Sequence, residues 1–354
     1  MTPSQPSAAL KPRIVWIDVA RGYGILLVVV GHVQRGLVKS GILVPTEFTR
    51  FLDSWIYAFH MPLFFLLSGL FLKISLQKGF AEFTAHKLRT IAYPYLLWSV
   101  LTVIVKASLG ALVNRPRELS HLPSILVTPI EQFWFLYALF VLTMLIGGLI
   151  TVGVRLWLLA VVALVAYPAV LPFAASGWPP LDDTRHYAIY VMIGVLAHGC
   201  VSIPVRIPRA TSVGLSALGF VCVALFATLT TFPGRDLVVP IVALIGIAAT
   251  IALAAATSAT SVGTLMQYLG RHSLEIYVAH TIASAGARIM LAKEFNIYDP
   301  TVHIALGIFA GVLGPLGLVL ALRRLGVQWA FVLPKRAQPA LRGSLHSAEE
   351  GERL

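Results

Sequence analysis

Apolar segments about as long as a membrane is thick follow one another along almost the whole chain. A span needs about 20 mostly apolar residues, because a helix rises about 1.5 Å per residue through a hydrocarbon core of about 30 Å. Charged residues make up only 12% of the chain, against about 25% in soluble domains. These features predict an all-α integral membrane protein in which about ten transmembrane helices form a single bundle. The expected helices lie near residues 14–38, 51–76, 88–113, 130–150, 156–175, 186–203, 211–232, 237–257, 264–292 and 301–325.

The apolar segments are too closely spaced for separate cores, so we predict one membrane domain over residues 13–333. Residues 1–12 and 334–354 are polar and are expected to be disordered tails. With the N-terminus placed inside, most lysines and arginines fall in cytoplasmic loops, as the positive-inside rule requires. Both termini are therefore expected to be cytoplasmic.

The net charge of +12 does not indicate nucleic-acid binding. The basic residues stand at the ends of apolar segments and form no continuous face, which is typical of anchoring in a lipid bilayer. Two cysteines without CxxC spacing do not indicate a metal site. We expect no metal.

Asp18, Arg21 and His32 are ionisable residues on the first apolar segment. A helix turns about 100° per residue, so these spacings put all three side chains on one face. A charge at bilayer depth costs about 2.5–3.5 kcal/mol, so this face is expected to look into the protein. Asp18 and Arg21 are either a structural ion pair or part of a site. His32 is favoured as a general base, because imidazole titrates near neutral pH.

The second apolar segment contains His60, followed by Met61 and Pro62. Proline removes a backbone donor and frees a carbonyl, so a local break in the helix is expected there. His60 is interpreted either as a substrate contact or as the partner of that break.

A basic stretch with His86, Lys87 and Arg89 precedes the third expected helix. Positive-inside anchoring explains most of this charge. The functional alternative is that an arginine guanidinium binds an anionic cytoplasmic cofactor through two parallel hydrogen bonds.

Later segments place further polar residues at or inside the membrane. Glu131 and Trp134 fall at an expected outer interface, where aromatic anchoring is the default interpretation. His280 is a membrane-embedded ionisable residue and hence a functional candidate.

Five motifs in order resemble the acyltransferase-3 family, in particular its fucose 4-O-acetylase-like branch. They are IDVARGYGILLVVVGHV, FHMPLFFLLSGLF, a basic pair before YPYLLW, FWFLYALF and LGRHSLEIYVAH, and the resemblance covers residues 14–325. Members of this family are ten-helix membrane enzymes that O-acylate glycans, with acetyl-CoA as the donor. The resemblance places the family's essential arginine and histidine on Arg21 and His32. It places the family's RxxR element on His86 and Arg89, so the first arginine of that element is absent here.

The resemblance implies an O-acetyltransferase of the bacterial inner membrane that acts on an exported or cell-surface glycan, or on a lipid-linked oligosaccharide. In this hypothesis Arg89, Lys87 and His86 bind acetyl-CoA, Arg21 and Asp18 line the path, and His32 deprotonates the sugar hydroxyl or carries the acyl group. The acceptor contacts would be His60, Trp134, Glu131 and His280. Two alternatives remain: a transporter or flippase for a glycan or lipid-linked sugar, and a non-catalytic subunit of an export assembly.

Overall fold

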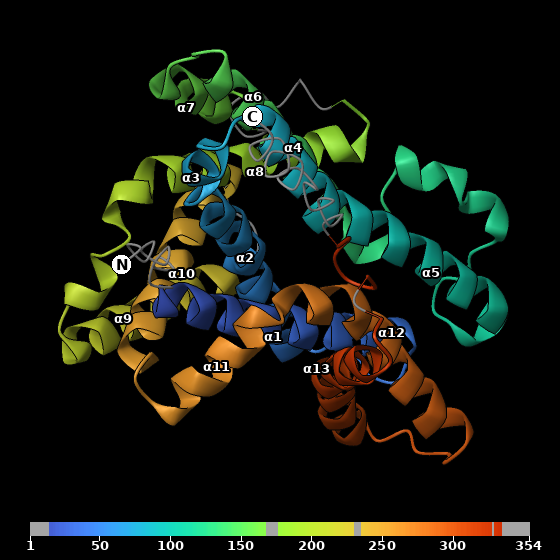
Figure 1. Ribbon diagram of the computed structural model, residues 1–354. Coiled ribbons are helices and arrows are strands. Elements are labelled where there is room, and N and C mark those ends of the chain that lie inside the picture. The colour runs from blue at the N-terminus through green and yellow to red at the C-terminus, as the bar shows by residue number, and fades with distance from the viewer. Residues whose placement is uncertain (1–13, 168–175, 230–234, 328, 335–354) are drawn as a thin grey trace, which may run out of the picture.

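The computed structural model describes residues 14–167, 176–229, 235–327 and 329–334 (Figure 1). Within these ranges the chain forms helices and no strands. The α-helices are α1 (Val15–Lys39), α2 (Glu47–Gly69), α3 (Leu72–Leu76), α4 (Phe80–Lys87), α5 (Tyr93–Leu109), α6 (Trp134–Thr151), α7 (Leu156–Val165), α8 (Pro179–Leu196), α9 (Arg209–Thr228), α10 (Arg235–Thr257), α11 (Ser261–Arg271), α12 (Ser273–Lys293) and α13 (Pro300–Arg324). A π-helical turn covers Leu88–Ala92, and short 3₁₀ turns cover Gly110–Leu112, Leu119–His121, Pro123–Leu126, Glu131–Phe133, Ala197–Cys200 and Pro204–Arg206.

Side-chain caps start several of these helices where the sequence supplies them. Thr46 and Thr49 form a reciprocal capping box at the start of α2. Asp299 accepts a hydrogen bond from the Val302 amide at 2.9 Å, and Pro300 takes the first position of α13, where no amide donor is needed.

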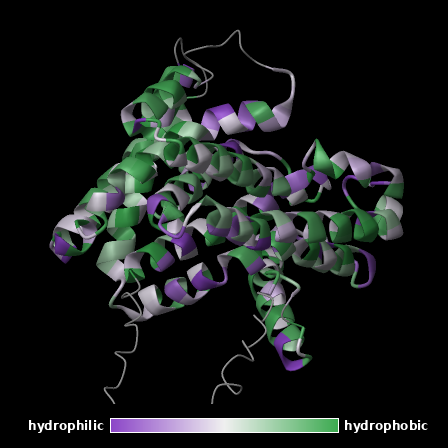
Figure 2. Ribbon diagram, turned by 45° about the horizontal axis from the view of Figure 1, so that its top comes forward, coloured by the Kyte–Doolittle hydropathy of each residue, from purple (hydrophilic) through white to green (hydrophobic). Residues whose placement is uncertain are grey.

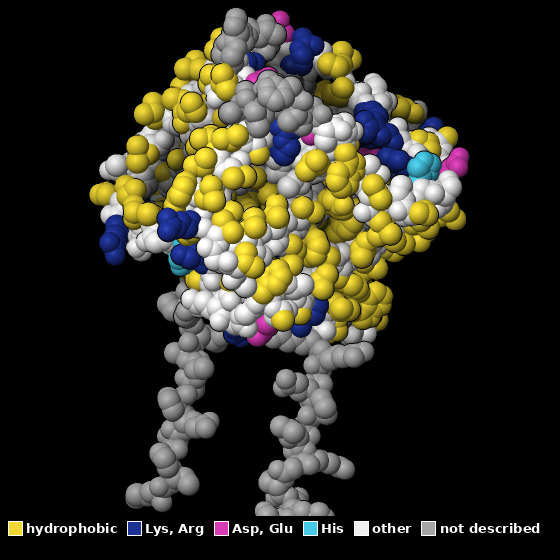
Figure 3. Space-filling model, turned by 90° about the horizontal axis from the view of Figure 1, so that it is seen from above, with side chains coloured by type: hydrophobic (Ala, Val, Ile, Leu, Met, Phe, Trp, Pro, Cys, Tyr) yellow, Lys and Arg dark blue, Asp and Glu magenta, His cyan; other side chains and the backbone are white. Residues whose placement is uncertain are grey.

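Seven helical segments among the described residues are long and apolar enough to cross a membrane. They are Val15–Lys39, Glu47–Leu76, Phe80–Leu112, Leu119–Thr151, Arg209–Thr228, Arg235–Thr257 and Pro300–Arg324. Large apolar side chains stand on the outside of these helices, and Leu218, Leu225 and Phe309 are each more than 60% exposed. Figure 2 shows apolar residues along most of the helices, and Figure 3 shows apolar side chains over much of the face in view. This surface suits lipid, so the prediction of an all-helical membrane protein is confirmed.

The predicted count of ten spans is not confirmed. The segment expected at 264–292 is two helices, α11 and α12, which meet at His272. α12 is not among the seven because its ionisable and small residues lower its hydropathy. In the segment expected at 156–175, α7 ends at Val165, and residues 168–175 lie outside the described ranges. The predicted tails 1–12 and 335–354 also lie outside them.

The predicted break in the second segment at His60 is wrong. α2 continues as one helix past Pro62 to Gly69, and α3 carries the apolar segment on to Leu76, the expected end of the span. His60 Nδ1 lies 2.7 Å from the Ile56 carbonyl oxygen. Pro62 has no amide N–H, so the Ala58 carbonyl, four residues earlier, loses its helical hydrogen bond. His60 contacts the Ile56 carbonyl and therefore does not replace that bond.

The first helix is the centre of the bundle. α1 packs against α2, α10, α11, α12 and α13, and crosses the middle of Figure 1. The crossing with α11 is the closest of these, because Gly22 and Gly270 bring the two backbones together: a Cβ atom on either glycine would overlap a backbone oxygen of the other helix. Every residue on the inner face of α1 is thus held by several partners.

Candidate active site

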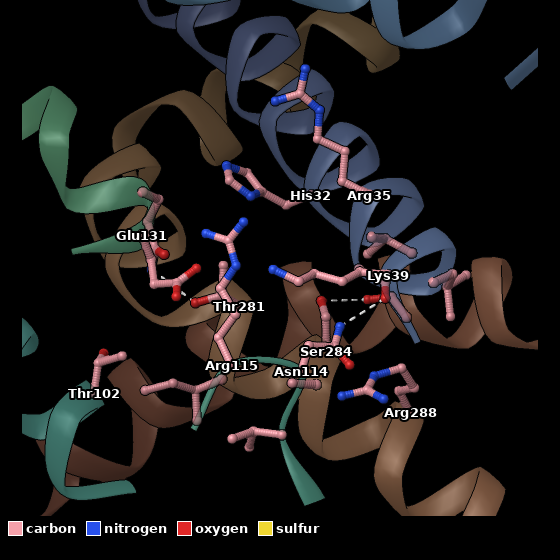
Figure 4. Close-up of a pocket in the computed structure, with 18 of the residues that line it drawn as sticks. His32, Arg35, Lys39, Thr102, Asn114, Arg115, Glu131, Thr281, Ser284 and Arg288 are labelled. Carbon is pink, nitrogen blue, oxygen red and sulfur yellow. Dashed lines mark hydrogen bonds between the residues drawn. The ribbon is translucent and has the colours of Figure 1, made fainter. Parts of the chain in front are cut away.

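A pocket of about 480 Å³ lies against the second half of α1 (Figure 4). Its walls come from α1, α2, α5, α12, α13 and the first residue of α6, together with the loop that joins α5 to α6. Apolar and polar groups are mixed in the lining, as in small-molecule sites. Its polar and charged lining residues are His32, Arg35, Lys39, Tyr57, His60, Thr102, Lys106, Asn114, Arg115, Glu131, Gln132, Trp134, Tyr277, Thr281, Ser284, Arg288 and His303.

His32 is a half-buried residue of α1 whose ring meets His280 of α12 at the pocket. The two ring centroids are 5.0 Å apart in an edge-to-face arrangement. The two residues are far apart in sequence, and the packing of α1 against α12 brings them together.

Hydrogen bonds to the backbone determine which nitrogen of His280 carries the proton. Its Nδ1 lies 2.8 Å from the Tyr277 carbonyl oxygen, which can only accept, so Nδ1 is the protonated nitrogen. The Nε2 atom of the neutral ring is then an acceptor, and it is buried without a hydrogen-bond partner among the described residues. The same reasoning applies to His60, whose Nδ1 donates to Ile56. In both neutral rings Nε2 is therefore the acceptor nitrogen.

The loop before α6 is tied to α12. The Tyr277 hydroxyl donates to the Gln132 carbonyl oxygen, and Gln132 Nε2 donates to Thr281 Oγ1 at 2.8 Å. Glu131 forms a 2.7 Å ion pair with Lys106 and has a positive φ of 47°, a conformation that non-glycine residues rarely adopt. These contacts hold Glu131, a predicted contact of the glycan acceptor, in the pocket wall.

Trp134 also lies inside the molecule. It lines the pocket and packs on Phe65 and Tyr187, with ring centroids 6.4 and 5.2 Å away. Its place in an aromatic cluster differs from the interfacial anchoring taken as the default.

The opposite end of α1 carries a separate cationic group. Buried Asp18 pairs with Arg21 at 4.0 Å, as one interpretation predicted, and also with Arg271 at 3.5 Å. Lys87 lies close enough to Arg21 for the two charges to repel. Arg89 sits on the π-helical turn, and its Nε atom is buried with no hydrogen-bond partner among the described residues. π-Helical turns often mark functional sites.

The predicted site residues thus fall into two groups. His32, His60, Glu131 and Trp134 line the pocket, with His280 directly behind His32. Asp18 and Arg21 lie toward the other end of α1, with Arg21 about 16 Å along the helix from His32, and Lys87 lies near Arg21. Arg89 and exposed His86 are neighbours of Lys87 in the chain. Among the described residues, none between Arg21 and His32 on α1 lines the pocket.

Comparison with known proteins decides the family. The chain matches the model of the acyltransferase-3 family, an acyltransferase domain, over residues 14–320. The chain belongs to the acyltransferase-3 family. It is also 29% identical over 191 residues to the nodulation protein NolL of Mesorhizobium japonicum. That alignment covers 52% of this chain and 48% of the relative, so the match spans about half of each protein. No solved structure shows significant similarity to the chain.

The pocket of this acyltransferase-3 protein contains functional groups that the sequence analysis missed. Arg35 makes two hydrogen bonds to Asp53, at 2.5 and 2.8 Å, and its guanidinium lies 3.2 Å from the Tyr57 ring centroid. Arg35 follows His32 by three residues and so lies on the same face of α1. This spacing could have identified Arg35 from the sequence. Lys39, Arg115 and Arg288 were counted only as loop charges. Among the described residues no cluster of histidine, cysteine or acidic groups could hold a metal ion.

Proposed function

We propose that this acyltransferase-3 protein transfers an acetyl group from cytoplasmic acetyl-CoA to a hydroxyl of an exported or cell-surface glycan. Its site would lie in the bacterial inner membrane, with both termini cytoplasmic. The observation that carries the proposal is the position of His32. A half-buried imidazole faces a pocket large enough for a sugar, with a second imidazole behind it. Membership of an acyltransferase family supports the reaction type.

In the proposed reaction, the oxygen of the acceptor hydroxyl attacks the thioester carbonyl carbon while His32 accepts the proton of that hydroxyl. The new C–O bond forms, the C–S bond breaks, and the proton passes from His32 to the leaving thiolate of CoA. The free Nε2 atom of His280, 5.0 Å away between ring centroids, is placed to orient the His32 ring or stabilise its protonated form. Polar groups of the pocket wall would hold the sugar with its hydroxyl positioned for attack on the carbonyl carbon.

The cationic group at the other end of α1 would bind the donor. Arg21, Lys87 and Arg89 gather positive charge there, and the orphaned Nε of Arg89 supplies a buried donor for a phosphate oxygen. The stretch of α1 between Arg21 and His32 separates this group from the pocket. The acetyl end of the donor would therefore reach His32 only when the helices around α1 move apart.

Arg89→Gln is expected to raise the KM for acetyl-CoA about 10- to 100-fold with little change in kcat. A hydrogen bond to a charged group contributes about 1.5–3 kcal/mol, and this bond would form equally in the ground state and the transition state. Steady-state kinetics over a range of acetyl-CoA concentrations measures the effect. Lys78→Gln is the matched control, because Lys78 is an exposed neighbour paired with Glu82. A fall in kcat at unchanged KM would remove Arg89 from donor binding.

The function itself is tested with the purified protein reconstituted in sealed vesicles. Radiolabelled acetyl-CoA is supplied on one side and a mixture of bacterial glycans on both sides, and the label in the glycan is followed together with free CoA. We expect labelled glycan and CoA in equal amounts. Movement of unmodified glycan across the membrane without label transfer would instead support a transporter or flippase. Neither product nor movement would support a non-catalytic subunit.

A further inference from the structure

Three cations of the pocket lack an acidic partner. Lys39, Arg115 and Arg288 line the pocket, and no carboxylate of the described residues lies within 4.0 Å of their side-chain nitrogens. Figure 4 shows Lys39 and Arg115 reaching toward the space beside His32, with Arg288 next to Asn114. The other two cations are neutralised, Arg35 by Asp53 and Lys106 by Glu131. The pocket therefore carries excess positive charge.

Four buried polar atoms in the same lining lack hydrogen-bond partners among the described residues. One is Tyr57 Oη, and the other three are Gln132 Oε1, Thr102 Oγ1 and His303 Nδ1, on side chains that are 1–2% exposed. Gln132 uses its amide nitrogen on Thr281, so its oxygen is left as an acceptor. His303 Nε2 lies 2.9 Å from the Ile297 carbonyl oxygen and must donate to it, so Nδ1 is also an acceptor. Buried polar atoms are nearly always paired, so these await donors from a ligand.

We propose that the acceptor is an acidic glycan whose oxyanion binds Arg115, Lys39 and Arg288. Its hydroxyl groups donate to Gln132, Thr102 and His303, and one further hydroxyl reaches His32. The oxyanion is the carboxylate of a uronic acid or the phosphate of a lipid-linked sugar, since guanidinium groups bind both by the same paired hydrogen bonds. This inference rests on the proposed function, because it treats the pocket around His32 as the acceptor site.

The geometry favours the acceptor over the donor as the source of this oxyanion. The phosphates of acetyl-CoA have their own cationic group, Arg21, Lys87 and Arg89, about 16 Å away along α1. Lys39 and Arg115 instead reach toward the space beside His32, where the attacking hydroxyl would bind (Figure 4).

Direct binding measures the preference without requiring turnover. His32→Ala protein in nanodiscs of uncharged lipid is titrated with two matched pairs of probes. One pair is trigalacturonate and its carboxyl-reduced neutral form, and the other is a short polyprenyl-phosphate galactose and the corresponding neutral polyprenyl galactoside. At least one acidic probe is expected to bind at least about tenfold more tightly than its neutral partner. The affinity of that probe should fall at high salt. Binding of galacturonate identifies a carboxylate, and binding of the phosphate probe identifies a lipid-linked sugar. Equal affinity within both pairs overturns the proposal.

Arg115→Gln and Arg288→Gln are each expected to lower the affinity for the preferred acidic probe about 10- to 100-fold. The affinity for its neutral partner should stay unchanged. Arg117→Gln, in the same loop but outside the pocket lining, should have no effect. Binding of acetyl-CoA should be the same in all three variants. If Arg115→Gln weakens acetyl-CoA binding instead, the pocket holds the donor and the proposal fails.

The two proposals fail in different ways. Absence of acetyl transfer by the unmodified protein would reject the proposed function, whereas the acidic preference of the His32→Ala protein would remain measurable. The comparison of acidic and neutral probes needs no pocket-arginine variant, so it stands even if those variants do not fold.

Discussion

His32→Ala is expected to lower acetyl transfer by the purified protein by about 10²- to 10⁴-fold, the contribution of a general base. The His32 imidazole faces the pocket, whereas Arg35 and Lys39 of the same helix are cations and accept no proton. Alanine offers no proton acceptor at position 32. His280 lies behind it and would not contact the acceptor hydroxyl directly. Initial rates of CoA release in the presence of glycan acceptor measure the loss.

The control for this experiment is His121→Ala, which removes a half-buried histidine outside the pocket lining. It should transfer acetyl groups at the rate of the unmodified protein. Both variants should elute from size-exclusion chromatography as the parent does, which separates lost chemistry from lost folding. If His32→Ala transfers acetyl groups normally, His32 has no part in the reaction.

Gly270→Ala is expected to destabilise the protein by about 3 kcal/mol or more, at the upper end of what overpacking costs. The added Cβ would overlap the backbone oxygen of Asp18, and a backbone atom cannot rotate away as a side chain can. α1 and α11 would have to separate, and that movement would displace the ion pairs of Asp18 with Arg21 and Arg271. Thermal unfolding in detergent measures the loss.

Gly214→Ala is the matched control for this substitution. Gly214 is also helical, but a Cβ there would meet no atom within 4 Å. Its unfolding temperature should stay the same or rise slightly, because alanine favours helix more than glycine does. Equal stability of Gly270→Ala and the unmodified protein would show that α1 and α11 are not in the close contact described here.

The arrangement along α1 follows partly from its own sequence. Spacing alone places His32 on the same helix face as Arg21, about 16 Å away, because rise and twist per residue are local properties of any α-helix. The membrane class follows from apolar length and low charge, since lipid is the solvent that accepts such a surface. The ion pair of Asp18 with Arg21 also needs only a spacing of three residues.

The partners of those residues depend on how distant segments pack. The pocket forms where α1, α12, α13 and a long loop come together. This packing brings His32 against His280 and places Arg115 and Arg288 in the lining. It also leaves the acceptor atoms of Gln132 and His303 without partners among the described residues. Periodicity and hydropathy predict where a helix runs and which face is polar. They do not predict which other helix covers that face, because that choice depends on close packing between residues far apart in the chain, such as Gly22 against Met266.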